Sequence, residues 1–203
     1  LAPGETTLVI PVAAPSARLW SPDSPVLHVC ETELLEADRV ADVRRDTFGF
    51  RWFEPAGIGR DATFRLNGRR IFLRSAISWG FFPINGIYAT PEIAERQIRT
   101  ARAMGLNMLH FHRAIGQPHI LDLADELGLL YYAEPGNYKS GDADPFAAAM
   151  AREKLLRMVR RDRNHPSLVI YNLINEDGHV APDRLARRER DLADAHALDP
   201  SRS

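Results

Sequence analysis

The stretch Arg161-Asp-Arg-Asn-His-Pro-Ser-Leu-Val-Ile-Tyr-Asn-Leu-Ile-Asn-Glu176 decides the fold of this chain. Its second half, Leu168 to Ile174, is an apolar run, which is typical of a strand covered on both faces of a parallel sheet. The run ends on the polar pair Asn175 and Glu176. In a barrel of alternating strands and helices, the carboxyl ends of the strands surround the ligand site. We therefore expect Glu176 at such a rim, where its carboxyl group can donate and accept a proton.

The chain from residue 71 onward alternates between strand and helix patterns. The predicted strands are residues 71–78, 106–112, 129–133 and 168–174, and each is followed by a stretch with helical periodicity. A complete eight-unit barrel takes about 250 residues. The pattern therefore predicts an α/β fold made of the first four strand-helix units of a TIM (β/α)8 barrel.

Local signals mark where these helices begin and end. Thr90 and Pro91 predict the start of the first helix and Gly105 its end, whereas Gly128 ends the second and Asp144 begins the third. The expected inward-facing residues are Ala94, Ile98, Ala101 and Met104 in the first helix, Ile120, Leu123, Ala124 and Leu127 in the second, and Phe146, Met150, Leu155, Leu156, Met158 and Val159 in the third. The fourth helix is expected over about residues 183–197.

The first 60 residues have a β pattern instead. Strands are expected over Thr6–Val12, Val26–Leu34 and Val40–Phe53, and a hairpin that turns at Asn67-Gly68 follows them. Three strands cannot bury two faces of a sheet, so we interpret this part as the last strands of an immunoglobulin-like β-sandwich. The predicted domains are residues 1–60, the sandwich part, and 61–203, the barrel part.

Composition excludes several classes of function. The chain has 203 residues, 45% of them hydrophobic, and a net charge of −1. It has no excess of positive charge to attract nucleic acid or an anionic membrane, and no apolar stretch approaches the roughly 20 residues that span a bilayer. Its single cysteine, Cys30, allows no internal disulfide. The chain begins at Leu1 rather than at methionine, which suggests a segment of a longer protein and leaves its compartment unpredicted.

The motif Arg161-Asp-Arg-Asn-His-Pro166 followed by Asn175-Glu176 resembles the acid/base strand of glycoside hydrolase family 2, the family of β-galactosidases, β-glucuronidases and β-mannosidases. Further similar segments are Trp20-Ser-Pro-Asp-Ser-Pro25, Phe48-Gly-Phe-Arg51 and Leu121-Asp-Leu-Ala-Asp-Glu-Leu-Gly-Leu129. The resemblance implies a retaining glycosidase that acts with two carboxylates on a carbohydrate substrate. Glu176 would be the general acid/base, and Asn175 would bind the sugar 2-hydroxyl. No cofactor and no metal are implied.

Five further residues are expected near the same rim. Trp79 follows the first strand and could stack on a sugar or cover the barrel mouth. His110 and His112 share one face of the second strand, where they could bind hydroxyls, ligate a metal or be structural. Arg113 could pair with the acid groups, bind a substrate carboxylate or be an ordinary surface arginine. Glu134 follows the third strand and could support the site or belong to a turn.

The second strand departs from the pattern of the family that the chain resembles. In Gly105-Leu-Asn-Met-Leu-His-Phe-His-Arg113, His110 stands where that family has arginine and Arg113 where it has histidine. The family's nucleophile is a glutamate on the seventh strand, which this chain does not contain. We therefore expect no glycosidase activity from these residues alone. We also expect self-association or a homo-oligomer, because half a barrel exposes two strand edges.

Three other interpretations remain open. His110 and His112 could serve a metal-dependent barrel hydrolase, since paired histidines at a strand end suit zinc. The chain could instead come from a carbohydrate-binding relative that has lost its activity. Finally, Asn175-Glu-Asp-Gly178 could be only a polar turn after a core strand.

Overall fold

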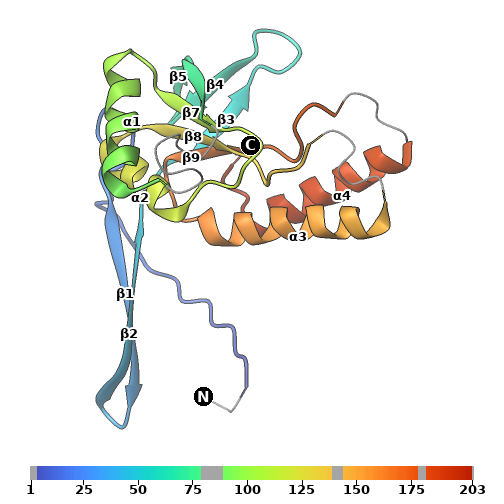
Figure 1. The fold of residues 1–203 in the computed structure, drawn as a ribbon. Helices are drawn as coiled ribbons and strands as arrows, with labels where there is room; N and C mark the ends of the chain where they lie inside the picture. Colours follow the sequence, from blue (N-terminus) through green and yellow to red (C-terminus); the bar gives the residue numbers. More distant parts are fainter. Residues whose placement is uncertain (1–3, 79–88, 139–143, 178–181, 203) are drawn as a thin grey trace.

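The computed structural model describes residues 4–78, 89–138, 144–177 and 182–202. Its centre is a parallel sheet in the order β6-β7-β8-β9, formed by Ser75–Ser78, Met108–Phe111, Leu130–Ala133 and Leu168–Tyr171. The helices α1 (Pro91–Ala103), α2 (Pro118–Leu127), α3 (Pro145–Asp162) and α4 (Pro182–Leu198) alternate with these strands along the chain (Figure 1). Strands that follow each other in the sequence are neighbours in the sheet, which confirms the predicted α/β half barrel.

The two faces of the sheet contribute to different hydrophobic cores, because side chains alternate along a strand. Leu109 and Phe111 of β7 pack with buried residues of all four helices. On the other face, Met108 packs with residues of β8 and β9 and with Trp20. This second core is closed by a small antiparallel sheet of β3 (Phe53–Ala56), β4 (Thr63–Leu66) and β5 (Arg69–Ile71), which contributes Phe53 and Leu66.

The predicted turns and caps are confirmed. The hairpin between β4 and β5 turns at Asn67 and Gly68, whose φ angles are 52° and 76°. The Thr90 side chain accepts a hydrogen bond from the Ile93 amide at the start of α1, and Asp144 does the same for Ala147 in α3. Gly128 ends α2 in the left-handed conformation, with φ 72°. These local signals set the positions of the helices.

Several predicted boundaries are wrong. Residues 5–14 form no strand, although Thr6–Val12 was expected to be one. The first barrel strand begins at Ser75 rather than Ile71, because Ile71 belongs to β5 and pairs with Phe64. The predicted strand Val40–Phe53 is divided between β2 (Arg39–Phe48) and β3, and β9 ends at Tyr171 rather than Ile174.

Part of the predicted helix packing is also wrong. Met104 is 73% exposed because it lies at the C-cap of α1, beyond the last buried residue, Ala101. Phe146 and Met150 of α3 are exposed as well, whereas Leu155, Leu156, Met158 and Val159 are buried. The first turns of α3 therefore extend past the core, and only the second half of the helix packs on the sheet.

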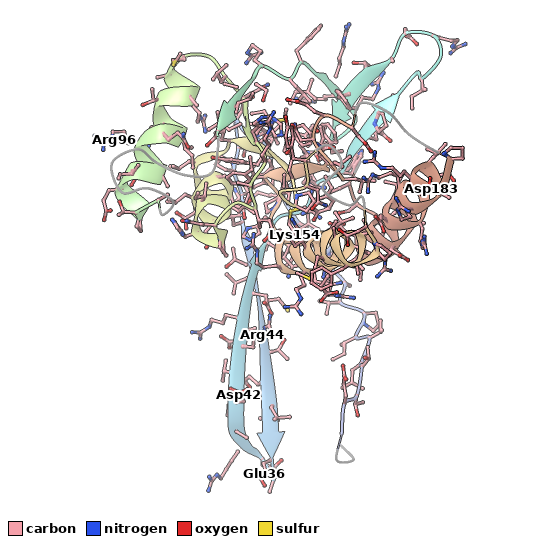
Figure 2. The ribbon with its side chains drawn as sticks, turned by 45° about the vertical axis from the view of Figure 1, so that its right-hand side comes forward. Glu36, Asp42, Arg44, Arg96, Lys154 and Asp183 are labelled. Atoms are coloured by element: carbon pink, nitrogen blue, oxygen red, sulfur yellow. The ribbon has the colours of Figure 1, made fainter. Side chains whose placement is uncertain are left out.

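The strands β1 (His28–Glu36) and β2 form a long antiparallel hairpin that projects from the body (Figures 1 and 2). Glu36, Asp42 and Arg44 point away from it into solvent (Figure 2). Almost every side chain along the hairpin is exposed. This is expected for one layer of a β-sandwich when the second layer is absent. The division at residue 60 into a sandwich part and a barrel part remains a prediction.

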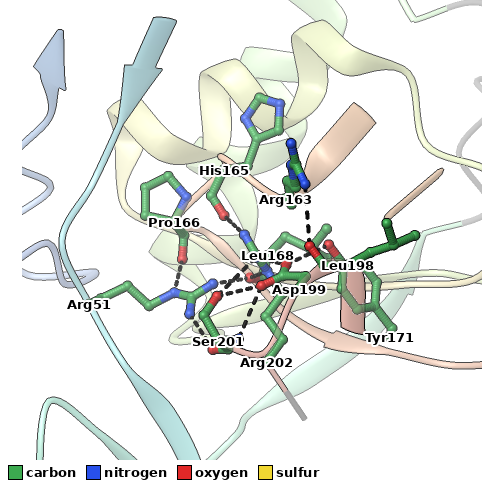
Figure 3. Close-up of polar contacts among 10 residues, drawn as sticks. All are labelled: Arg51, Arg163, His165, Pro166, Leu168, Tyr171, Leu198, Asp199, Ser201 and Arg202. Carbon is green, nitrogen blue, oxygen red and sulfur yellow. Dashed lines mark hydrogen bonds and ion pairs between the residues drawn. The ribbon is translucent and has the colours of Figure 1, made fainter. Parts of the chain in front are cut away.

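A polar cluster joins the segment after this hairpin to the start of β9 (Figure 3). Arg51 donates hydrogen bonds to the carbonyl oxygens of Pro166, Leu168 and Ser201, at 3.0, 2.7 and 2.8 Å. Arg202 binds the same Leu168 carbonyl and pairs with Asp199. Burial and the neighbouring Arg202 lower the pKa of Arg51 to about 9. The cluster fixes the beginning of the strand that leads to Glu176.

Candidate active site

The structure brings six of the seven predicted site residues together at the carboxyl ends of three strands. His110, His112 and Arg113 belong to or follow β7, Glu134 follows β8, and Asn175 and Glu176 follow β9. Trp79 lies outside the described residues. The short connection from β9 to Asn175 is held by a bridge to Tyr138 and a hydrogen bond from the Asn175 amide to the Asn137 carbonyl.

Glu134 is at the centre of this group and is fully buried. Its Oε1 lies 2.5 Å from His110 Nε2 and accepts from the side-chain amides of Asn172 and Asn175 at 3.1 and 3.3 Å. Its Oε2 accepts from the backbone amide of Arg113 at 2.8 Å. Burial raises the pKa of Glu134, but these hydrogen bonds outweigh burial and hold it below its ordinary value. Glu134 is therefore an anion that ties β7 and β9 together.

The two histidines point to the same face of β7, as predicted. His110 stacks on Tyr132, with ring centroids 4.1 Å apart and planes 11° from parallel. His112 stands edge-on to His110, with the ring centroids 5.5 Å apart, and its Nδ1 lies 3.4 Å from the side-chain nitrogen Nδ2 of Asn175. Both rings are largely buried, at 14% exposure for the His110 side chain and 9% for His112. They form the wall of the site next to Glu134.

Arg113 and Glu176 face each other across the rim and form an ion pair. The guanidinium of Arg113 lies 3.9 Å from the centroid of the Tyr138 ring, and its Nε donates to Asn175 Oδ1 at 3.1 Å. Both partners have left-handed backbones, with φ 57° at Arg113 and 54° at Glu176. Such conformations cost free energy in non-glycine residues and gather at functional sites. The Glu176 side chain is half-exposed, so its carboxyl group is accessible from solvent.

The arrangement also bears on the metal interpretation. His110, His112 and Glu134 each offer a ligand atom, and these atoms lie within 4.8 Å of one another. Two imidazoles and a carboxylate are a common zinc-binding set. However, Glu134 already accepts four hydrogen bonds, one of them from His110. A metal ion would have to compete with these donors for the Glu134 oxygens.

Sequence reasoning missed three residues that shape the site: Tyr132, Tyr138 and Asn172. Asn172 lies within the otherwise apolar run Leu168 to Ile174 and was not singled out, although a polar residue in such a run indicates a buried hydrogen bond. Tyr138 lies just after Glu134-Pro-Gly-Asn137 in a loop, and nothing local marks it as the platform beneath Arg113.

Within the described part of the chain, no helix combines the length and apolar character that a membrane span requires.

Two family models match the chain. The model described as glycosyl hydrolases family 2 matches residues 2–51, and the model of the family 2 TIM barrel domain matches residues 59–203. The chain belongs to glycosyl hydrolases family 2. Its parallel half barrel is therefore part of a family 2 TIM barrel domain.

Relatives of this family 2 chain include proteins named as β-glucuronidases and a β-galacturonidase. A putative β-glucuronidase of Formosa agariphila is 30% identical over the whole chain, which spans 19% of that relative. The solved β-glucuronidase 3 of Bacteroides uniformis is 32% identical with a TM-score of 0.78, over 92% of this chain and 24% of its own. A family 2 β-galacturonidase from Eisenbergiella tayi, solved with bound galacturonate, is 25% identical with a TM-score of 0.83, over 94% and 34%. The chain thus spans about a third of these proteins or less.

Proposed function

We propose that this family 2 chain supplies the general acid/base of a retaining β-glycosidase and that Glu176 is this residue. The observation that carries the proposal is the position of Glu176 after the carboxyl end of β9, next to Asn175 and with its carboxyl group half-exposed. Family membership and the glycosidase names of the relatives support the same reaction. The substrate is a carbohydrate with a β-glycosidic bond.

In this reaction Glu176 first protonates the departing glycosidic oxygen and then removes a proton from the attacking water. A second carboxylate must attack the anomeric carbon between these steps. Among the described carboxylates at the strand ends, the hydrogen bonds of Glu134 make it a support rather than a nucleophile, and Asp177 pairs with Arg184 and Arg188 of α4. Asn175, adjacent to Glu176, is placed to bind a sugar hydroxyl.

The test is Glu176→Gln in a protein that carries this chain together with the remaining barrel strands. We expect turnover of β-glycosides with poor leaving groups to fall far more than turnover of activated aryl glycosides, because only poor leaving groups need a proton. Glu126→Gln, an exposed change on α2, is the matched control and should change neither rate. Equal losses with both substrates would contradict the acid role.

A companion measurement uses the 203-residue chain alone. We expect no turnover of aryl glycosides, since a proton donor without a nucleophile leaves the oxocarbenium-like centre unsupported. Hydrolysis by this chain that Glu176→Gln abolishes would contradict that expectation. Sugar binding without hydrolysis by the protein with all barrel strands would instead favour the carbohydrate-binding interpretation.

A further inference from the structure

The ion pair between Arg113 and Glu176 poses a chemical problem for the proposed reaction. A general acid must carry a proton when the glycoside binds, but a nearby positive charge favours the ionised form of a carboxyl group. The guanidinium of Arg113 contacts Glu176 Oε1 directly. Glu176 paired in this way is suited to act as a base but is a poor acid. The pair must therefore separate before the first step.

Arg113 is fixed independently of Glu176, so it stays in place when the pair separates. Its backbone amide is held by buried Glu134, its Nε by Asn175, and the face of its guanidinium by the Tyr138 ring. Glu176 is the more exposed partner, with its side chain 50% exposed against 29% for Arg113, so it has room to turn toward solvent. Separation thus leaves a guanidinium edge that is oriented into the proposed sugar site.

The other charged groups near the rim are engaged elsewhere. Asp177, the next residue after Glu176, pairs with Arg184 and Arg188 of α4. Glu134 pairs with His110 on the buried side of Arg113. Among the described charged groups near the rim, the guanidinium of Arg113 is thus the positive group that pairs with the exposed carboxylate of Glu176.

We infer that Arg113 recognises a carboxylate of the substrate, so that the glycoside acted on is a uronic acid glycoside; this rests on the proposed function of Glu176. A planar guanidinium binds the two oxygens of a carboxylate through two parallel hydrogen bonds, whereas a sugar hydroxyl offers a single oxygen. The incoming carboxylate takes the place of Glu176 on Arg113. It also brings a negative charge close to the released Glu176, which favours the protonated form that acid catalysis needs. Neutral sugars lack the group that separates the pair.

The first arm of the experiment measures binding by the protein with all barrel strands and does not depend on hydrolysis. The Nε–Hε resonance of Arg113, assigned by its loss in Arg113→Lys, is followed by NMR during titration with D-glucuronate or with D-glucose at constant ionic strength. We expect a saturable shift with glucuronate and none with glucose. Equal responses to both sugars, or no saturable shift with glucuronate, would overturn the inference even if Glu176 proves to be the acid/base.

The second arm uses the protein with all barrel strands and a matched pair of aryl β-glycosides, the glucuronide and the glucoside, which differ only at C6. Arg113→Gln should lower kcat/KM for the glucuronide at least a hundredfold and should not lower that for the glucoside, because the glucoside does not use the guanidinium and no longer meets an ion pair that it cannot separate. Arg113→Lys should restore part of the loss. Arg99→Gln removes an exposed ion pair with Glu95 on α1 and serves as the control.

Equal losses for the two glycosides in Arg113→Gln would show that Arg113 only supports Glu176, which overturns the inference and leaves the proposed function standing. If Glu176→Gln loses turnover of poor leaving groups far more than turnover of the aryl glycosides, and Arg113→Gln selectively loses the glucuronide, both the proposed function and this inference are supported. If the wild-type protein hydrolyses neither glycoside, the proposed function fails, and the NMR titration alone decides whether Arg113 binds a uronate.

Discussion

At the scale of single residues, the carboxylate of Glu134 joins two strands that are not neighbours in the sheet. Its donors come from His110 and Arg113 at the end of β7 and from Asn172 and Asn175 after β9. A buried acceptor that satisfies several donors is costly to remove, because each donor then loses its partner in a place that water does not reach. Glu134 should therefore matter for folding as well as for the site.

We predict that Glu134→Gln lowers the free energy of unfolding by about 1–3 kcal/mol, since the new amide group turns donors toward existing donors. Urea denaturation at pH 7 measures this difference. Glu126→Gln, an exposed change of the same chemistry on α2, should stay within about 0.5 kcal/mol of the wild type. Equal stabilities of the two variants would rule out the structural role of Glu134.

The difference in unfolding free energy between wild type and Glu134→Gln should depend on pH in a defined way. The pKa of Glu134 is lowered in the folded state, so its contribution is fully present above the ordinary glutamate value, about 4.3. That contribution is lost as the pH falls through the lower folded value. The stability difference between wild type and Glu134→Gln should therefore be constant from pH 6 to pH 7 and shrink below about pH 4. A difference that grows on acidification would contradict this assignment.

The metal interpretation leads to a separate prediction at the residue scale. We expect one equivalent of Zn²⁺ to leave the melting temperature unchanged, because the ion would have to compete with the donors on the Glu134 oxygens as it bound His110 and His112. Thermal denaturation with zinc and with a chelator measures this. A zinc-dependent rise in melting temperature that both His110→Ala and His112→Ala abolish would establish the metal site instead.

At the scale of elements, the C-terminus of α2 is where the half barrel meets the segment before the hairpin. Gly128 has φ 72°, and a Cβ atom added there would lie 2.3 Å from the Pro22 carbonyl oxygen. Gly105, after α1, has φ 81° but nothing within 4 Å of such a Cβ atom. The two glycines therefore share a left-handed backbone and differ in their surroundings.

We predict that Gly105→Ala costs about 1–2 kcal/mol of unfolding free energy, the cost of a left-handed backbone with a side chain. Gly128→Ala should cost a further 1–3 kcal/mol, roughly the cost of overpacking, because the Pro22 backbone has to move. Chemical denaturation of both variants separates the two terms. Equal losses would mean that the segment at Pro22 yields freely and does not bind α2 tightly.

Sequence reasoning succeeded for elements whose signals are local. Thr90, Asp144 and Gly128 each act on their own backbone neighbourhood, so the residue type alone predicts the helix end. It failed where the outcome depends on partners far along the chain. The alternation in Thr6–Val12 is typical of a strand, but a strand requires a neighbour to pair with, and the described structure places none beside residues 5–14.

The site was predictable to the same extent. Parallel strands end at one edge of a sheet, so the positions of His110, Glu134 and Glu176 along the chain were enough to place them together. Which of them contact each other depends on strand register and backbone angle. The left-handed conformation of Arg113 turns its side chain toward Asn175 and Glu176 while its amide faces Glu134. No sequence signal at Arg113 indicates this.

At the scale of the whole molecule, helices cover one face of the parallel sheet and the small antiparallel sheet packs on the other, but no further strand pairs with its two edge strands among the described residues. Among the described residues, β6 and β9 each have a single strand neighbour in the parallel sheet. Ile77 of β6 points to the same side as its register partner His110 and is 57% exposed. An edge with unpaired backbone groups and exposed apolar side chains is a template for pairing with another chain.

We predict that the 203-residue chain self-associates at micromolar concentrations and that Ile77→Lys shifts it toward the monomer, because a charged side chain on an edge strand opposes pairing. Sedimentation velocity over a concentration series measures the distribution. Ile58→Lys is the matched control, since Ile58 is even more exposed but lies in the turn between β3 and β4. Reduced association in Ile77→Lys alone would place the contact at the β6 edge, whereas equal reduction in both variants would indicate nonspecific apolar contacts. A wild-type chain that remains monomeric throughout the series would show that the β6 and β9 edges are protected in solution.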